Sequence, residues 1–394
     1  MPEPARIGSF SESDVCMLLT ELDGNRASAS LAGFSWEAAE RSLFPAEYQP
    51  SPGYLAAVRA LIAKTSRSVA LLCATLAEEM LRRRGHRLVI VSIARAGTPI
   101  GIIIRRWLRY RHALDVPHYC LSAAGRGPDL SALGWLARRH SPDTLQFLDA
   151  WTSKGTIRAA LESAGSHLEL PGLDTTLAVV CDTASCTDLF ATREDVLLPH
   201  ACLGAGMSGL LSRTVSDSGL LSANDFHGVR YYGELAWTDL SRCYIDAVCA
   251  RFSEILRAAD GAADSRPVSV LPDERGKDQA ALLADRYGAS DIDLVNIGIC
   301  ESTRAFFRRK PAMLLLHPAA GHQVNHLLML AAERHVPVQP ETSMPFRAAL
   351  LLSAPAVSVR AGHRNVCPVR RDGPGRAAGG RAPGDAILDA LLEG

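Results

Sequence analysis

The chain has 394 residues, more than one ordinary hydrophobic core can organise, which indicates two or three folded domains. Lysine plus arginine and aspartate plus glutamate each number 42, so the formal net charge is +0 and no overall field attracts nucleic acid or an anionic membrane. The N-terminus lacks a signal-peptide pattern, no stretch approaches the ~20 apolar residues of a membrane span, and the ten scattered cysteines contain no C-x-x-C pair. We therefore expect a cytoplasmic protein with reduced thiols, no membrane partner and no protein-built metal site.

Residues 1–86 are expected to form a helical N-terminal extension packed on the main domain. The segment SPGYLAAVRALIAKTSRSVALLCATLAEEMLRRRG starts with Ser-Pro and repeats apolar residues every three or four positions. Gly85 follows its last turn, which is a typical helix stop. The pattern therefore predicts one long helix before the main domain begins.

Residues 87–255 are expected to form the main domain, in which short apolar strands alternate with helices. The β-branched run 88–93 is followed by a loop and a helix from about Pro99. The run 144–148 is likewise followed by a loop and a helix from about Thr156. Such alternation predicts the α/β class, with a parallel sheet covered by helices on both faces and ligands beyond the carboxyl ends of the strands.

The remaining chain divides by composition into three further segments. Residues 256–281 are rich in Ala, Asp, Pro and Gly, which suits a linker. Residues 282–353 return to an α/β pattern and predict a smaller domain. Residues 354–394 are rich in Gly, Arg and Pro and predict a disordered tail.

The loop after the strand 144–148 carries the most informative side chains. Asp149 follows the strand directly, where its carboxylate can accept hydrogen bonds from ribose hydroxyls. Backbone N–H groups at a helix start bear partial positive charge, and Gly155 lets an anion approach the backbone closely. Further donors are offered by Thr152, Ser153, Lys154 and Thr156. This chemistry favours a phosphate ligand, although the Walker spacing is absent.

A strand, an acid, a short loop, and then Gly and Thr at a helix start resemble the phosphoribosyl-pyrophosphate motif of type I phosphoribosyltransferases. The family motif has two adjacent acids followed by Thr-Gly-x-Thr, whereas Ala150 and Lys154 stand here for the second acid and the first Thr. The earlier loop 95–98 is similar to the pyrophosphate-binding loop of the same fold. Arg126 lies in a Gly-rich loop that suits a cover over the pyrophosphate, since a guanidinium pairs with two phosphate oxygens.

The resemblance implies a glycosyltransferase with the type I phosphoribosyltransferase fold. Phosphoribosyl pyrophosphate with Mg²⁺ would lie across both loops, and the phosphoribosyl group would pass to an unknown small-molecule acceptor such as a nucleobase. The implied catalytic residues are Asp149, Arg95 and Lys154. The implied ligand-binding residues are Ala96, Gly97, Thr98, Arg126, Thr152, Ser153, Gly155 and Thr156.

More of the chain, to about residue 353, resembles a bacterial family of stress and tellurium-resistance gene clusters. The resemblance rests on segments such as FSESDVCMLL, SIARAGTPIG, FLDAWTSKGT and TREDVLLPHACL. That family is described both as a phosphoribosyltransferase and as the cysteine protease StiP. A protease needs a thiolate activated by a nearby imidazole, and Cys202 with His227 is the candidate pair. Because two phosphate-type loops in the right order outweigh one Cys and one His, the transferase is the main prediction and the peptidase an alternative.

The segment Gly298-Ile-Cys-Glu-Ser-Thr-Arg304 opens a helix with a carboxylate in its first turn. It resembles the Gly-x-Asn-Glu-x-Thr-Lys segment with which the Pelota/L7Ae fold meets RNA. Glu301, Thr303 and Arg304 match this family segment. Cys300 stands where the family has Asn, and a thiol cannot form the paired hydrogen bonds of the Asn amide with a base edge. The resemblance implies RNA binding by the small domain, and a nucleotide-responsive RNA-binding protein without enzymatic activity is the second alternative.

Overall fold

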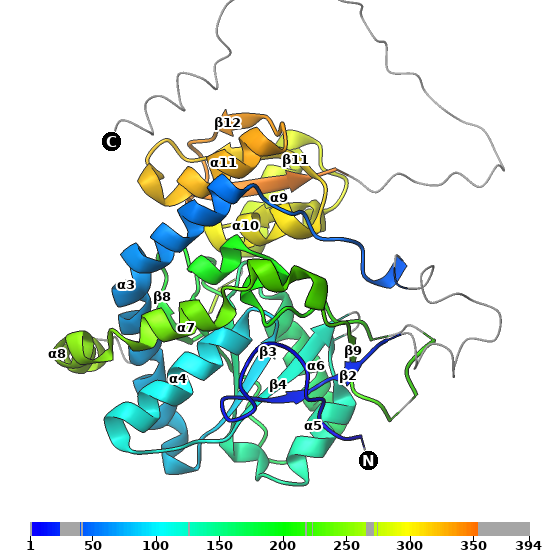
Figure 1. The fold of residues 1–394 in the computed structure, drawn as a ribbon, viewed down its shortest axis with the longest axis vertical. Coiled ribbons are helices and arrows are strands. Elements are labelled where there is room, and N and C mark those ends of the chain that lie inside the picture. The colour runs from blue at the N-terminus through cyan, green and yellow to red at the C-terminus, as the bar shows by residue number, and fades with distance from the viewer. Residues whose placement is uncertain are drawn as a thin grey trace, which may run out of the picture.

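The structure is a computed structural model (Figure 1), and it describes residues 2–23, 40, 42–124, 127–216, 219–222, 224–264, 272–273 and 275–353. Arg126 and the expected tail 354–394 lie outside the described residues. Predictions that concern them therefore stay predictions.

A parallel sheet forms the centre of the N-terminal domain. Its strands run in the order β1–β4–β3–β6–β7–β8, with parallel pairing throughout, and the short β5 pairs antiparallel with β4. The strands are β1 (Cys16–Leu18), β3 (Val89–Ala94), β4 (His118–Ala124), β5 (Gly127–Pro128), β6 (Leu145–Trp151), β7 (Leu177–Cys181) and β8 (Leu189–Thr192). A separate two-stranded pair joins β2 (Thr20–Glu21) to β9 (Gly228–Val229). The predicted α/β class with a parallel sheet is confirmed.

Helices cover both faces of this sheet, as the alternating pattern predicted. Successive side chains of β6 point to opposite faces of the sheet and are buried on both. Leu148 belongs to the hydrophobic core on one face, and Phe147 belongs to the core on the other face. The first face is covered by α3 (Pro52–Arg84), α4 (Gly97–His112), α7 (Ser241–Cys249) and α8 (Phe252–Asp264). The second face is covered by α5 (Leu130–Ala137) and α6 (Thr156–Leu168).

The N-terminal segment differs from the purely helical extension that the sequence predicted. Residues Cys16–Leu18 form the edge strand β1, with Met17 in one core and Leu18 in the other. A short strand buried on both faces has no alternating pattern, which explains why it was missed. The long helix α3 does end at Gly85, whose φ of 65° suits glycine.

The apolar composition of helix α3 contradicts the expectation that no stretch of the chain could span a membrane. By length and composition, Pro52–Arg87 is apolar enough to cross a bilayer, and it is the one such helix in the described part of the chain. Side chains along the helix, from Tyr54 to Met80, are buried in the core of the N-terminal domain. In this structure α3 is therefore a core helix, and its hydropathy is weak evidence for a membrane role.

The C-terminal domain contains a four-stranded sheet in the order β10–β13–β11–β12 with helices against it. Its elements are α9 (Arg275–Tyr287), β10 (Val295–Ile297), α10 (Ile299–Arg308), β11 (Pro311–Leu316), α11 (Asn325–Glu333), β12 (Val338–Pro340) and β13 (Ala348–Leu352). Helices α8 and α9 extend into both ends of the expected linker 256–281, because its alanines favour helix where they lie beside other apolar residues. The connecting 3-10 turns are Gly85–Arg87, Pro142–Thr144, Pro199–Cys202, Ala205–Met207, Gly233–Thr238, Ile292–Leu294 and Gly321–Val324.

The C-terminal domain packs on the carboxyl end of the main sheet, beside the start of α3 (Figure 1). Asp195 of the N-terminal domain caps α10, because its carboxylate accepts the N–H groups of Ile299 at 2.9 Å and Arg347 at 2.8 Å. A Cβ on Gly276 would lie 2.2 Å from the carbonyl oxygen of Ser153, so only glycine fits at this contact. The two domains therefore meet at the edge where the sequence predicted ligand-binding loops.

Candidate functional site

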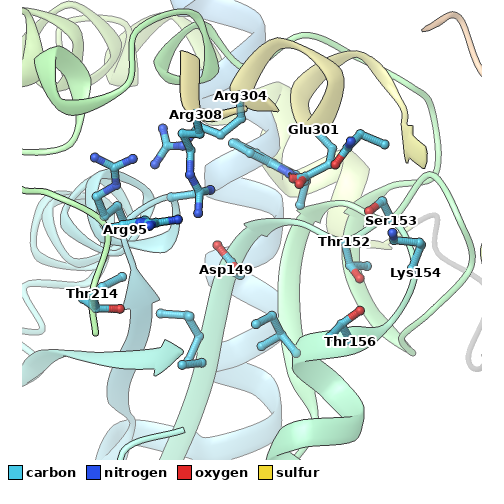
Figure 2. Close-up of a pocket in the computed structure, with 18 of the residues that line it drawn as sticks. Arg95, Asp149, Thr152, Ser153, Lys154, Thr156, Thr214, Glu301, Arg304 and Arg308 are labelled. Atoms are coloured by element: carbon cyan, nitrogen blue, oxygen red, sulfur yellow. The ribbon is translucent and has the colours of Figure 1, made fainter. Parts of the chain in front are cut away.

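A cavity of about 630 Å³ lies at the carboxyl ends of β3 and β6, where the C-terminal domain covers them. We call it the interdomain cavity. Figure 2 shows Arg95, Arg304 and Arg308 on one side, residues 152–156 on the other, and Asp149 between them. The cavity therefore brings together side chains from both expected loops and from α10.

Asp149 lies inside β6 rather than in the loop after it, because β6 continues to Trp151 and pairs there with Cys181. Its Oδ1 accepts the N–H of Ala150 at 2.7 Å. Burial raises the pKa of the Asp149 carboxyl to about 7, against the opposing effects of that hydrogen bond and of Arg304. The carboxyl therefore changes charge near neutral pH while facing the cavity.

The loop after β6 leads into α6 at Thr156, as predicted, and Gly155 precedes it with a φ of 70° that favours glycine. Thr152, Ser153 and Thr156 line the cavity. Lys154 also lies at the edge of the cavity, but its ammonium donates to the carbonyl oxygens of Ile292 at 2.9 Å and Val295 at 3.1 Å. The expected phosphate contact of Lys154 is thus replaced by an anchor to the C-terminal domain.

The loop 95–98 is divided between the cavity and the core. Arg95 and Ala96 line the cavity, and the Arg95 guanidinium donates to Glu47 Oε1 at 2.6 Å. Burial alone would raise the pKa of the Glu47 carboxyl, but the adjacent Arg95 guanidinium holds that pKa below its ordinary value. Gly97 packs where a Cβ would lie 2.6 Å from the carbonyl oxygen of Leu148, and the Thr98 hydroxyl lies 3.1 Å from the Cys120 sulfur. Neither Gly97 nor Thr98 lines the cavity, so both serve packing in this structure and their expected ligand-binding roles stay predictions.

Helix α10 supplies the positive charge that the sequence reasoning largely missed. Arg304 is 2% exposed, and its guanidinium donates to the His200 carbonyl oxygen at 3.3 Å and to Ser208 Oγ at 3.0 Å. Arg308 lies one turn further along α10, and solvent reaches it through the cavity. The spacing of four residues on one helix face was the available signal for Arg308.

The cavity lining has more positive than negative side chains. Burial, together with the nearby Arg95, lowers the pKa of Arg304 to about 9, and the exposed Arg308 lies one helical turn away. Among the described residues, no carboxylate lies within 4 Å of either guanidinium. The cations of the lining are Arg95, Lys154, Arg213, Arg304, Arg308 and Arg309, and the carboxylates are Asp149, Asp293 and Glu301. This arrangement is suited to an anionic ligand.

The residues expected to meet RNA at the start of α10 lie against the N-terminal domain and the interdomain cavity. Thr303 is fully buried, and its hydroxyl donates to the Ile299 carbonyl oxygen at 2.7 Å and lies 2.7 Å from His326 Nε2. Glu301 accepts the indole N–H of Trp151 at 2.8 Å, and Arg304 faces the N-terminal domain. Thr303 is therefore closed to RNA in this structure, whereas Glu301 and Arg304 line the interdomain cavity, and RNA binding by these residues stays a prediction.

The structure also separates the candidate protease pair. Cys202 is fully buried in the core beneath α3, and burial raises the pKa of its thiol to about 12. His227 Nδ1 lies 2.9 Å from Ser122 Oγ, and its backbone N–H donates to Asp129. Within the described ranges, no cysteine sulfur forms a hydrogen bond with a histidine ring. Cys202 and His227 do not form a catalytic dyad here.

These observations define a two-domain α/β protein with an arginine-lined cavity between its domains. The chain belongs to the StiP family, because the family model described as "Tellurite-like stress resistance cysteine protease StiP" matches residues 8–249. A relative named "Cysteine protease StiP" from Acinetobacter baylyi (strain ATCC 33305 / BD413 / ADP1) is 30% identical over 297 residues, covering 70% of this chain and 75% of the relative. The PELOTA RNA binding domain matches residues 274–354, which confirms the predicted C-terminal module.

The comparisons overturn the main functional prediction. The family and the relative are named as a cysteine protease, so the expected phosphoribosyltransferase, a glycosyltransferase acting on phosphoribosyl pyrophosphate, is wrong. Ala150 and Lys154 depart from the transferase motif, so this loop does not specify the transferase reaction. No solved structure matches the chain, and the finer assignment to the type I phosphoribosyltransferase fold stays a prediction.

Proposed function

We propose that this StiP-family chain binds a small ligand through an oxyanion group, most simply a phosphate, in the interdomain cavity. One observation carries the proposal: the guanidinium groups of Arg304 and Arg308 have no carboxylate within 4 Å among the described residues, and they line one cavity together with Arg95, which Glu47 already pairs (Figure 2). Guanidinium forks match the paired oxygens of phosphates and carboxylates. An oxyanion would offset the burial and the repulsion from Arg95 that together lower the pKa of Arg304.

The surrounding groups fit the rest of such a ligand. The hydroxyls of Thr152 and Thr156 face the cavity from the start of α6, where the helix dipole favours an anion. Asp149 can accept a ligand hydroxyl when ionised. The described residues contain no group of three His, Cys, Asp or Glu side chains that could hold a metal, so any Mg²⁺ would be held chiefly by the ligand's oxygens.

We expect sulfate to bind more tightly at pH 6 than at pH 8, by about three- to tenfold. Sulfate keeps two charges over this range, whereas the pKa of Asp149 is raised to about 7. Below that pKa the carboxyl is protonated and neutral, and as the pH rises through it the new negative charge opposes the anion. Calorimetric titration at several pH values measures the affinity.

Asp149→Asn provides the control for this pH dependence. The amide has the same shape and stays neutral, so the variant should bind sulfate at pH 8 as tightly as the wild type does at pH 6. An equal slope in both proteins would show that Asp149 does not face the bound anion. Repeating the titration with phosphate, with and without Mg²⁺, tests the proposed contribution of the metal.

A second candidate function is peptide-bond hydrolysis by a cysteine thiolate. The observation that favours it is the description of the family and of its Acinetobacter baylyi member as a cysteine protease. Such an activity needs a thiolate and a neighbouring base. The buried thiol of Cys202, with its pKa raised to about 12, does not meet this need in the folded chain.

Thiol labelling tests whether Cys202 is the nucleophile. We expect iodoacetamide to modify Cys202 at least about 100-fold more slowly than the exposed Cys243, because only an accessible thiolate reacts. Mass spectrometry of the labelled peptides gives both rates in one sample. If Cys202 reacted faster than Cys243, and Cys202→Ala abolished hydrolysis of a casein substrate, the peptidase would replace anion binding as the leading function.

RNA is the proposed macromolecular partner, since the C-terminal domain matches the PELOTA RNA binding domain. The start of α10 lies against the N-terminal domain, so RNA can reach Glu301 and Arg304 only through the interdomain cavity. A cytoplasmic location, which suits access to RNA and to soluble phosphates, remains part of the proposal.

A further inference from the structure

A second cavity, of about 490 Å³, lies beside the interdomain cavity at the other end of α10. We call it the α10-end cavity. It shares three residues with the interdomain cavity, namely Arg213, Arg308 and Arg309. The two cavities are therefore adjacent, with these arginines between them.

The α10-end cavity is strongly basic. Its lining carries no aspartate or glutamate among the described residues, and its cations are Arg213, Arg308, Arg309, Lys310 and Arg334. Lys310 and Arg309 are exposed to solvent. Within the part of the chain that the structure describes, no carboxylate lies within 4 Å of either side chain.

Helix geometry alone does not explain this convergence of charge. Arginines at the end of α10 do stabilise its negative dipole end. However, Arg213 comes from the N-terminal domain and Arg334 follows α11. Arg334 is held in place by its donation to the Arg309 carbonyl oxygen at 3.4 Å and by its position 4.9 Å from the Tyr48 ring centre. Separate parts of the fold thus point cations into one cavity.

We propose that the α10-end cavity holds backbone phosphates of a single-stranded RNA whose terminal phosphate occupies the interdomain cavity. This inference rests on the proposed function, because it uses the same first anion site. A terminal phosphate carries more charge than a phosphodiester, which suits the cavity lined by Arg95, Arg304 and Arg308. The phosphodiesters that follow would pass Arg308 and Arg309 to reach Lys310 and Arg334.

Two features favour a single RNA strand over other polyanions. Trp151 lines the interdomain cavity, where it offers an aromatic surface to the terminal base. The cavities are lined by residues of both packed domains, a setting that suits an unpaired chain better than a wide duplex. The PELOTA match indicates RNA as the partner of this domain, and the two cavities give it a path past the start of α10.

Fluorescence anisotropy with oligouridylates of about eight nucleotides tests this path. We expect a strand that ends in a 5′- or 3′-phosphate to bind at least about tenfold more tightly than the same strand with two hydroxyl ends. Lys310→Glu should weaken binding of the phosphorylated strand by about tenfold and lower the slope of log affinity against log salt by about 0.7. Lys64→Glu, a matched charge reversal on the exposed surface of α3, should change affinity by less than about twofold.

Sulfate titration of the same proteins separates the two proposals. Lys310→Glu should bind sulfate as the wild type does, because Lys310 does not line the interdomain cavity. If wild type fails to bind sulfate, the proposed function fails. If sulfate binds but Lys310→Glu and Lys64→Glu weaken RNA equally, the RNA path is wrong while the anion site stands. Equal affinity for inorganic polyphosphate of the same charge would overturn the assignment to RNA.

Discussion

Replacing Arg304 with methionine should lower the affinity for sulfate by about 10- to 100-fold. Methionine keeps much of the length and packing of arginine but removes the charge. Charged hydrogen bonds in buried sites contribute about 1.5–3 kcal/mol each, which corresponds to this range. Arg304 is 2% exposed and lies against the cavity, so water cannot replace its guanidinium. Calorimetric titration with sulfate at pH 6.5 measures the change.

The control is Arg59→Met, which removes an exposed arginine of α3. Arg59 does not line the interdomain cavity. It should leave the sulfate affinity unchanged. Circular dichroism should give the same helix signal for both variants and the wild type. If Arg304→Met and Arg59→Met bound sulfate equally well, Arg304 would have no role in anion binding.

Gly276→Ala should lower the free energy of unfolding by about 1–3 kcal/mol and weaken sulfate binding at the same time. The added Cβ would lie 2.1 Å from the Ala184 Cβ and 2.2 Å from the Ser153 carbonyl oxygen, so the two domains must move apart. Because Ser153 lines the interdomain cavity, this movement also displaces the loop before α6. Denaturant titration and sulfate calorimetry on the same samples measure the two effects.

Gly53→Ala is the corresponding control, since its nearest contact for an added Cβ is Ser51 Oγ at 3.6 Å, an ordinary distance. Alanine is also the better helix former in α3, so stability should stay equal or rise slightly. Unchanged stability in Gly276→Ala would show that the domains tolerate a looser contact. Loss of stability without loss of sulfate affinity would show that the cavity does not depend on this contact.

The sequence predicted the elements whose patterns are local. Strand and helix alternation indicated the parallel sheet, and the helix stop at Gly85 and start at Thr156 were predicted correctly. Strand β1 was missed because three residues buried on both faces show no periodicity. The order β1–β4–β3–β6–β7–β8 depends on contacts between distant segments, which one sequence does not reveal.

Only part of the candidate site was predicted, because the rest depends on contacts between segments that are distant in the sequence. Both loops of the N-terminal domain reach the cavity, so Arg95 and Asp149 were found from strand ends alone. Lys154 was assigned to a phosphate because nothing in the sequence shows that the carbonyl groups of Ile292 and Val295 lie beside it. Arg308 was missed because only the docking of the C-terminal domain brings α10 over the main sheet.

The transferase prediction failed for a different reason. A loop that can surround a phosphate does not specify a reaction, and fold-level resemblance does not carry function. The family comparisons name a cysteine protease, while the described cysteines form no hydrogen bond with histidine. What the geometry supports is therefore an anion-binding cavity between two domains.

Calorimetric titration of the full chain with inorganic phosphate, in a buffer free of other oxyanions, tests this cavity most directly. We expect one saturable site per chain that sulfate displaces competitively and that Arg304→Met weakens strongly. The absence of saturable heat in the wild type, or equal phosphate binding by wild type and Arg304→Met, would contradict an oxyanion site formed by the arginines of the interdomain cavity.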